Sequence, residues 1–362
     1  MDQSIRGRGA HANPGNRFEL RCYQADPDAL PEETAAPPSQ FFRDRSQSII
    51  ATNDSPDVGF EASLNPYRGC EHGCIYCYAR PTDEYLGLSA GLDFETKIMV
   101  KEDAPQLLRK ELASPRWQPK VLGLSGVTDP YQPIERRLQI TRRCLQVLAE
   151  FRNPVAIVTK NHLVTRDIDV LTDLANHRAA AVFISLTTLD GALARLMEPR
   201  ASQPAARIEA IRLLAGAGIP VGVMTAPIIP GLNDHEMPAL LAAARAAGAS
   251  YAGHVLLRLP HGVADLFTNW LERHFPDRKD KVLGRLRALR DGKLNDTRFG
   301  TRMKGEGLFA DVYKDMFQLA CRKVGITRRG PDLSAASFRR PQDTPPMLFD
   351  DDDLVRKADR AP

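Results

Sequence analysis

The sequence predicts an α/β protein whose main part is a partial (β/α)6 TIM-like barrel, followed by a C-terminal helical extension. Between residues 49 and 260, short apolar runs alternate with helical patterns, which is typical of repeated βα units. Beyond Pro260 the alternation stops and only helical patterns follow. A chain of 362 residues, 43% of them hydrophobic, is long enough to bury a core of this size.

The barrel is expected to begin with the segment that leads into Cys70. Apolar runs predict five further strands, at 120–125, 155–159, 180–186, 221–225 and 251–257. Amphipathic patterns predict the intervening helices, at 135–151, 167–176, 204–217 and 237–247. Crossovers between parallel strands are right-handed, so six units curl in one sense but fall short of the eight that close a full barrel.

The chain divides into four predicted regions. They are an extended, partly disordered arm (1–48), the barrel (49–260), a helical extension (261–326) with helices at 263–274, 279–289 and 307–323, and a tail (327–362). The arm is rich in Pro, Arg, Gly and Gln without periodicity. Its basic stretch at 6–10 fits either contact with nucleic acid or packing across the domain.

The charge distribution, the hydrophobic runs and the cysteines limit which partners and which cellular compartment we expect for this chain. The net charge is only +4, but residues 271–330 carry 16 Lys and Arg against 8 Asp and Glu. Such a face can meet phosphates, or it can be a solvated helical surface. No apolar run is long enough to span a membrane, and the first residues lack the apolar core of a signal peptide. Clustered cysteines without a paired framework indicate a reducing compartment, so we expect a cytoplasmic protein.

Three of the six cysteines, Cys70, Cys74 and Cys77, fall within eight residues in the spacing C-x3-C-x2-C. Structural zinc usually takes four ligands from two separated pairs, and here only His72 stands near as a fourth. Three unligated thiols in an exposed loop would invite oxidation without structural benefit. A 4Fe–4S cluster held by three cysteines keeps one iron open, and this hypothesis fits the spacing best.

This motif, with Tyr76 before its last cysteine, resembles that of the radical S-adenosylmethionine (SAM) enzymes. The resemblance implies that Tyr76 is one of the cofactor-binding residues. The stretch from Asn65 to Cys70, continued at 76–79 by Tyr-Cys-Tyr-Ala, is similar to spore photoproduct lyase and its DNA repair photolyase relatives. The resemblance covers about residues 50–325. It implies a radical SAM barrel, a 4Fe–4S cluster that cleaves SAM to a 5′-deoxyadenosyl radical, and an electron donor of the flavodoxin or ferredoxin type.

Polar residues at predicted strand ends supply candidate SAM contacts, because α/β folds gather their sites at that edge. Thr128 and Asp129 end the second strand and are expected near the methionine ammonium. The resemblance implies that Lys160 pairs with the methionine carboxylate. Ser185 ends the fourth strand, near the ribose or carboxylate. Thr128, Asp129 and Ser185 could instead cap the following helices, and Lys160 could simply be exposed.

One residue type that the resemblance leads us to expect is missing. Spore photoproduct lyases carry a cysteine at the end of the second strand that returns a hydrogen atom to the product radical, but residues 124–129 contain none. Tyr131 is a candidate substitute. The substrate therefore stays open between a nucleic acid, a protein or peptide, and a small molecule. A cluster-bearing sensor without turnover and a zinc-stabilised nucleic-acid module are the rival classes.

Overall fold

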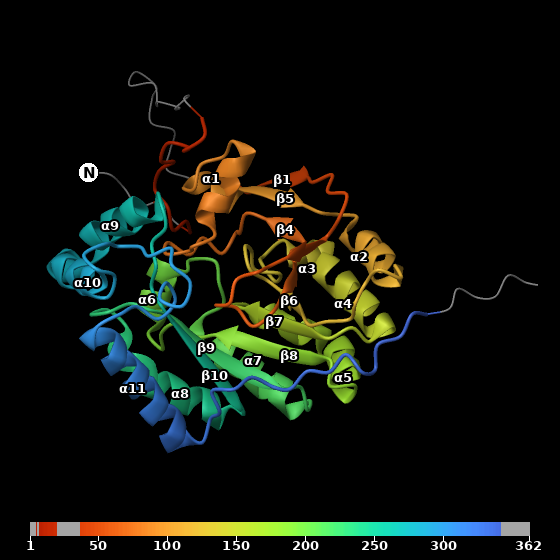
Figure 1. Cartoon of the computed structure of the whole chain (residues 1–362). Helices are drawn as coiled ribbons and strands as arrows, with labels where there is room; N and C mark the ends of the chain where they lie inside the picture. Colours follow the sequence, from red (N-terminus) through yellow and green to blue (C-terminus); the bar gives the residue numbers. More distant parts are fainter. Residues whose placement is uncertain (1–4, 6, 20–36, 342–362) are drawn as a thin grey trace, which may run out of the picture.

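A seven-stranded sheet forms the centre of the computed structural model, which describes residue 5 and residues 7–19 and 37–341 (Figure 1). Its strands run in the order β10–β9–β8–β7–β6–β3–β2. Their bounds are β2 (Ile50–Thr52), β3 (Ala62–Leu64), β6 (Leu122–Leu124), β7 (Val155–Thr159), β8 (Ala180–Ser185), β9 (Val221–Ile228) and β10 (Tyr251–Leu256). The six from β3 to β10 are parallel neighbours, and β2 pairs antiparallel with β3. The predicted six parallel strands are confirmed.

Helices cover the outer face of this sheet (Figure 1). They are α3 (Glu135–Leu138), α4 (Ile140–Phe151), α5 (Ile168–Asn176), α7 (Pro204–Gly216) and α8 (Met237–Ala246). The core lies between the two layers and includes Leu124, Ile157 and Ile184, all fully buried. A strand that is covered on both faces buries the side chains at successive positions. This explains why the sequence shows continuous apolar runs and not an alternating pattern.

The two edges of the sheet are connected through side chains. The loop after the edge strand β2 contains Asp57, which accepts hydrogen bonds from the backbone N–H of Gly300 (2.7 Å) and from the Arg302 guanidinium (2.5 Å). Gly300 and Arg302 belong to a segment that lies beside the other edge strand, because Leu256 donates to the carbonyl of Met303 (3.0 Å). This link between opposite edges is what a sheet curled into a partial barrel requires.

A second, three-stranded sheet lies above the first in Figure 1 and was not predicted. Its order is β1 (Gln40–Arg43), β5 (Lys97–Val100) and β4 (Tyr67–Arg68). The nearby helices are the 3-10 helix η1 (Arg80–Leu86), α1 (Leu92–Thr96) and α2 (Ala104–Ala113). β1 pairs with β5 although about 55 residues separate them, a non-local contact that no local pattern announces.

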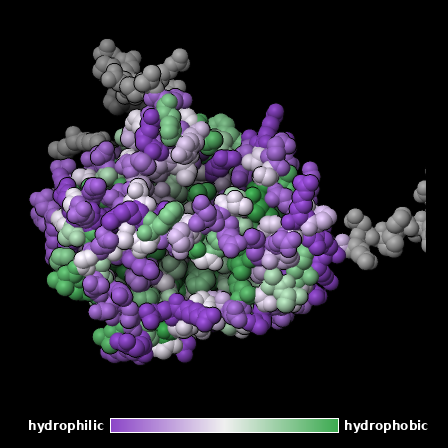
Figure 2. Space-filling model, viewed as in Figure 1, coloured by the Kyte–Doolittle hydropathy of each residue, from purple (hydrophilic) through white to green (hydrophobic). Residues whose placement is uncertain are grey.

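Beyond β10 the helical extension is present as α9 (Val263–His274), α10 (Pro276–Ala288) and α11 (Leu308–Val324). Residues 327–341, assigned to the tail from sequence, lie along the N-terminal edge of the strands. Ala252 donates to the carbonyl of Thr327 (2.9 Å), and Arg339 donates to the carbonyl of Phe151 (2.9 Å). Hydrophilic residues predominate on the face shown in Figure 2, with hydrophobic ones between them. Among the described residues, no helix is long and apolar enough to cross a membrane.

Four local predictions differ from the structure. The helix predicted at 135–151 is two helices, because Gln139 adopts a left-handed conformation (φ 53°) between α3 and α4. β9 continues to Ile228, past its predicted end. Helix α6 (Gly191–Met197) was not predicted, although the carboxylate of Asp190 caps it by accepting from Ala192 N–H (2.7 Å). The short 3-10 helices η2 (His162–Asp167) and η3 (Asp234–Glu236) were also not predicted.

Candidate active site

The three clustered cysteines lie on one tight loop, here called the cysteine loop (residues 69–80), which follows β4. Gly73 adopts a left-handed conformation (φ 65°) between the first two cysteines, a conformation that a side chain disfavours. Backbone hydrogen bonds from Gly73 to Cys70 (3.3 Å) and from Cys77 to Cys74 (3.1 Å) close its two turns. Cys70 and Cys74 are buried, whereas Cys77 is partly exposed.

The thiols are near enough to influence one another. Burial raises the pKa of Cys70, and Asp129, Cys74 and Cys77 raise it further. Thiolates so placed need a positive partner. In the part of the chain that the structure describes, no group of three His, Cys, Asp or Glu side chains surrounds a single metal-ion position. A cubane cluster does not need such a group, because each of its thiolates binds a different iron.

A buried ion pair, formed by Arg80 and Glu95, holds the cysteine loop in place. Arg80 and Glu95, both with 0% side-chain exposure, are 2.5 Å apart. The same guanidinium donates to the carbonyl of Cys74 (3.0 Å) and to the carbonyls of Ala90 (3.1 Å) and Gly91 (2.9 Å). A guanidinium with all its hydrogen bonds directed at one carboxylate and three carbonyls can hold a loop in one geometry.

The N-terminal segment (residues 7–19) covers the other side of this ion pair. The backbone N–H groups of Gly9 (3.0 Å) and Ala10 (2.8 Å) donate to the Glu95 carboxylate. Arg8 is buried and donates to the carbonyl of Glu95 (2.9 Å). The basic stretch in this segment therefore packs onto the cysteine loop, and the described part of it does not extend toward solvent.

A second buried pair, Glu198 with Arg207, lies on the opposite side of the loop. Glu198 also accepts from the hydroxyls of Tyr76 and Thr187. Burial alone would raise the pKa of Glu198, but Arg207 and Lys160 outweigh it and lower the pKa to about 2. The backbone beside Glu198 also binds the loop, since Ile75 donates to the carbonyl of Met197 (3.0 Å).

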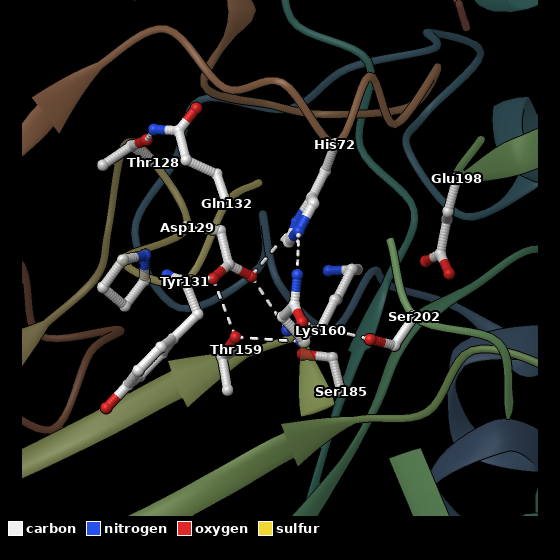
Figure 3. Close-up of polar contacts among 12 residues, drawn as sticks. His72, Thr128, Asp129, Tyr131, Gln132, Thr159, Lys160, Ser185, Glu198 and Ser202 are labelled. Atoms are coloured by element: carbon white, nitrogen blue, oxygen red, sulfur yellow. Dashed lines mark hydrogen bonds and ion pairs between the residues drawn. The ribbon is translucent and has the colours of Figure 1, made fainter. Parts of the chain in front are cut away.

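Asp129 is the centre of a hydrogen-bonded network at the ends of β6 and β7 (Figure 3). Its carboxylate accepts from Thr159 Oγ1 (2.7 Å), Lys160 N–H (2.8 Å) and Tyr131 N–H (2.9 Å), and His72 Nδ1 lies 3.3 Å away. Burial would raise the pKa of Asp129, but His72 and these hydrogen bonds lower it to about 2. Four donors use the acceptor capacity of one carboxylate.

His72, considered from sequence as a fourth zinc ligand on an exposed loop, is buried and engaged at both ring nitrogens. Nδ1 faces Asp129, and Nε2 lies 3.1 Å from Asn161 Nδ2. Because the Asn161 carbonyl oxygen accepts from Leu163 N–H (3.0 Å), its NH2 donates to Nε2, so the imidazole carries its proton on Nδ1. This leaves no nitrogen for a metal.

The other predicted SAM contacts divide into two kinds. Thr128 and Tyr76 are engaged internally, since the Thr128 hydroxyl donates to the carbonyl of Gly69 (2.6 Å) and Tyr76 binds Glu198. Lys160 and Ser185 are not, because neither the Lys160 ammonium nor the Ser185 hydroxyl has a hydrogen bond to another described residue. The ammonium lies 5.8 Å from the centroid of the Tyr76 ring, next to the cysteine loop.

Residues outside the site are placed as follows. Tyr131, the candidate substitute hydrogen donor, is fully buried and its hydroxyl donates to Asp167 (3.1 Å), which removes it from any substrate. Cys144 and Cys321, the two described cysteines outside the motif, are buried within α4 and α11. Cys22 lies outside the described residues.

A scan against protein families matches residues 64–244 to the radical SAM superfamily. The chain belongs to the radical SAM superfamily. An uncharacterized protein of Mycobacterium tuberculosis is 36% identical over 232 residues, covering 63% of this chain and 68% of the relative. Another, from Methanocaldococcus jannaschii, is 30% identical over 184 residues, covering 51% and 66%.

Solved structures agree on the fold of this radical SAM protein. A spore photoproduct lyase variant with bound AdoMet and dinucleoside spore photoproduct matches with a TM-score of 0.56, covering 80% of each chain at 18% sequence identity. A spore photoproduct lyase complexed with dinucleoside spore photoproduct matches with the same TM-score and coverage, at 17% identity. At this identity the likeness shows a shared fold, and radical SAM proteins typically bind a 4Fe–4S cluster and SAM.

The contact between the N-terminal segment and the cysteine loop predicts the effect of one added methyl group. In Gly9→Ala the new Cβ would lie 1.9 Å from the carbonyl oxygen of Gly73, so the two backbones must separate. We expect a loss of about 1–3 kcal/mol of unfolding free energy and faster tryptic cleavage of the segment. Gly15→Ala is the matched control, because its Cβ meets nothing within 4 Å. Equal stability and equal cleavage in the two variants would contradict the contact.

Proposed function

We propose that this chain is a radical SAM enzyme that holds one 4Fe–4S cluster through Cys70, Cys74 and Cys77 and acts on nucleic acid. The observation that carries the proposal is the cysteine loop itself. Three thiols on one loop, fixed by two buried ion pairs beside an unpaired Lys160, match the needs of a three-cysteine cluster with SAM as its partner. Family membership and the lyase fold support the same conclusion.

In this proposal the chain's residues bind and orient. Reductive cleavage of SAM at such a cluster supplies a 5′-deoxyadenosyl radical that abstracts a hydrogen atom from substrate. Lys160 binds the methionine carboxylate, and Ser185 donates its hydroxyl to the ribose or carboxylate. Thr128, Asp129 and Tyr76 serve as positioning residues, because their polar groups already hold Gly69, the Lys160 backbone and Glu198. Radical SAM enzymes need an external electron donor, for which we propose a flavodoxin or ferredoxin.

Nucleic acid is the substrate class that the resemblance to spore photoproduct lyase favours, and a lyase-like reaction comes with it. The excess of Lys and Arg after residue 271 supports it. A base within a duplex would have to leave the stack to reach the cysteine loop, at a cost of a few kcal/mol. Modification of a protein or small molecule is the alternative, as is a cluster-binding sensor without turnover. Cytoplasmic location stays a prediction.

The cluster assignment predicts a colour. Anaerobically reconstituted protein should be brown and bind about four irons, because Fe–S charge transfer absorbs in the visible range. Changing any one of Cys70, Cys74 or Cys77 to Ala should abolish iron retention. Cys144→Ala is the control, since that thiol is buried in a helix and should not matter. A colourless zinc protein, or full iron content in a triple variant, is incompatible with the assignment.

The role of Lys160 predicts a specific loss of SAM binding. A charge-assisted hydrogen bond contributes about 1.5–3 kcal/mol, so Lys160→Ala should weaken SAM binding about ten- to a hundredfold while the visible spectrum stays unchanged. Lys120→Ala, at the opposite end of the strands and paired with Glu61, should bind SAM normally. The measurement is equilibrium dialysis of SAM with reconstituted protein. An unchanged dissociation constant for Lys160→Ala would remove the role.

The substrate class is tested by the yield of 5′-deoxyadenosine. We expect UV-irradiated DNA or tRNA to stimulate SAM cleavage at low salt, and the stimulation to fall as salt rises, because phosphate contacts release counterions. Untreated DNA is the control. If nucleic acid neither binds at low salt nor stimulates cleavage, and a peptide or metabolite does, the nucleic-acid proposal fails while the radical chemistry stands.

A further inference from the structure

A second cation besides Lys160 lies beside the cysteine loop and has no assigned role. Arg258 follows β10, and its guanidinium lies 4.4 Å from the centroid of the Tyr78 ring. Tyr78 comes directly after Cys77, and its hydroxyl donates to the carbonyl of Gly126 (2.6 Å) just beyond the end of β6. Arg258 is thereby held between the cysteine loop and the C-terminal ends of the strands.

The Arg258 guanidinium is only partly exposed, yet it has no hydrogen bond and no ion pair within 4 Å among residues 7–19 and 37–341. The carboxylate of Asp57 acts on it only from a longer distance and is itself bound by Gly300 and Arg302. Burial lowers the pKa of Arg258, and nearby Arg302 lowers it further against the opposing effects of Tyr78, Asp57 and Cys77. Guanidinium groups are rarely left half-buried without an acceptor, since each N–H removed from water costs free energy. Apart from the face of the Tyr78 ring, the described residues give this guanidinium no hydrogen-bond acceptor.

Neighbouring arginines cannot take this role but support it. Arg302 is engaged by Asp57 (2.5 Å) and by Ser55 Oγ (2.5 Å). Arg290, 1% exposed, donates to the carbonyls of Leu257 (2.6 Å) and Arg302 (3.0 Å). Arg290 thus fixes the backbone at Leu257, next to Arg258, and at Arg302, while adding positive charge. Arg258 is therefore a guanidinium without a hydrogen-bonded partner on a backbone that its neighbours hold in place.

Lys160 and Arg258, the two cations without a hydrogen-bonded partner discussed above, each lie next to an aromatic ring of the cysteine loop. Lys160 lies near the ring of Tyr76, and Arg258 lies over the ring of Tyr78, one on each side of Cys77 in sequence. Lys160 already serves the SAM carboxylate in the proposed function. Arg258 is therefore free for the other reactant.

We propose that Arg258 forms an oxyanion-binding site beside the cysteine loop, where it takes a phosphate group of the substrate. The planar guanidinium offers two parallel N–H groups to a phosphate, a geometry that a lysine does not provide. The identification of that phosphate as part of a nucleic acid rests on the proposed function, whereas the site itself does not. The competing role for Arg258 is to neutralise the charge of the bound cluster.

The test uses reconstituted full-length protein and two probes, inorganic pyrophosphate by calorimetry and a fluorescent ten-nucleotide thymidine strand by anisotropy over a range of KCl. Arg258→Gln should weaken pyrophosphate binding at least tenfold. It should also reduce the slope of log affinity against log salt for the oligonucleotide by about one. Arg258→Lys, which keeps the charge, should retain part of the affinity. The control is Arg116→Gln, which should change neither the pyrophosphate affinity nor the salt slope. Arg116 is exposed and precedes β6, at the opposite end of the strands from Arg258.

Each outcome decides between the proposals. Pyrophosphate binding lost in Arg258→Gln, with no oligonucleotide binding by the wild type, leaves the site standing and removes the nucleic acid. Equal pyrophosphate binding by the wild type and Arg258→Gln, or none by the wild type, overturns the site whatever the oligonucleotide does. A shifted midpoint potential in Arg258→Gln with unchanged pyrophosphate affinity assigns Arg258 to the cluster instead. Circular dichroism checks that each variant is folded, and Arg258→Lys serves if Arg258→Gln is not.

Discussion

The buried ion pair between Arg80 and Glu95 is the interaction on which the rest of the site depends. Its guanidinium fixes the Cys74 carbonyl, while its carboxylate receives the backbone of Gly9 and Ala10. Burying two charges costs several kcal/mol that their attraction only partly offsets, so such a pair is poor evidence for stability. Its contribution is to geometry. Removing Arg80 or Glu95 would leave an uncompensated buried charge next to the cysteine loop. Conformations of the loop that separate the two charges are disfavoured for the same reason.

The same principle operates on the far side of the loop. Glu198 and Arg207 connect the cysteine loop to the end of β8, because Arg207 also donates to the carbonyl of Ser185 (3.0 Å). Asp129 connects the ends of β6 and β7 in the same manner. The buried carboxylates of Glu95 and Glu198 and the largely buried one of Asp129 therefore hold a loop and three strand ends in one arrangement. Lys160 and Arg258 remain unpaired within the described chain, which is the condition for binding anionic groups of two reactants.

The sequence predicted what local patterns encode. The strands 155–159 and 180–186 and the helix 263–274 follow from apolar runs and periodicity, and the cysteine spacing pointed to the right family. It did not predict the partners of the loop. Glu198 stands 122 residues from Tyr76, and Gly9 stands 86 residues from Glu95, so nothing local links them. Asp129 was expected to face a ligand, yet neighbours fill its acceptor positions. A strand-end carboxylate looks the same in sequence whether it binds a ligand or orients the backbone.

The central claim is that three cysteines of this loop leave one iron of a cluster open to SAM. Mössbauer spectroscopy of protein reconstituted with ⁵⁷Fe tests it most directly, because one iron in four should differ from the rest. Adding SAM should raise the isomer shift of that iron alone, and the effect should be clearly smaller in Lys160→Ala at SAM concentrations that just saturate the wild type. Four equivalent irons that do not respond to SAM, or a mononuclear site, would contradict the account.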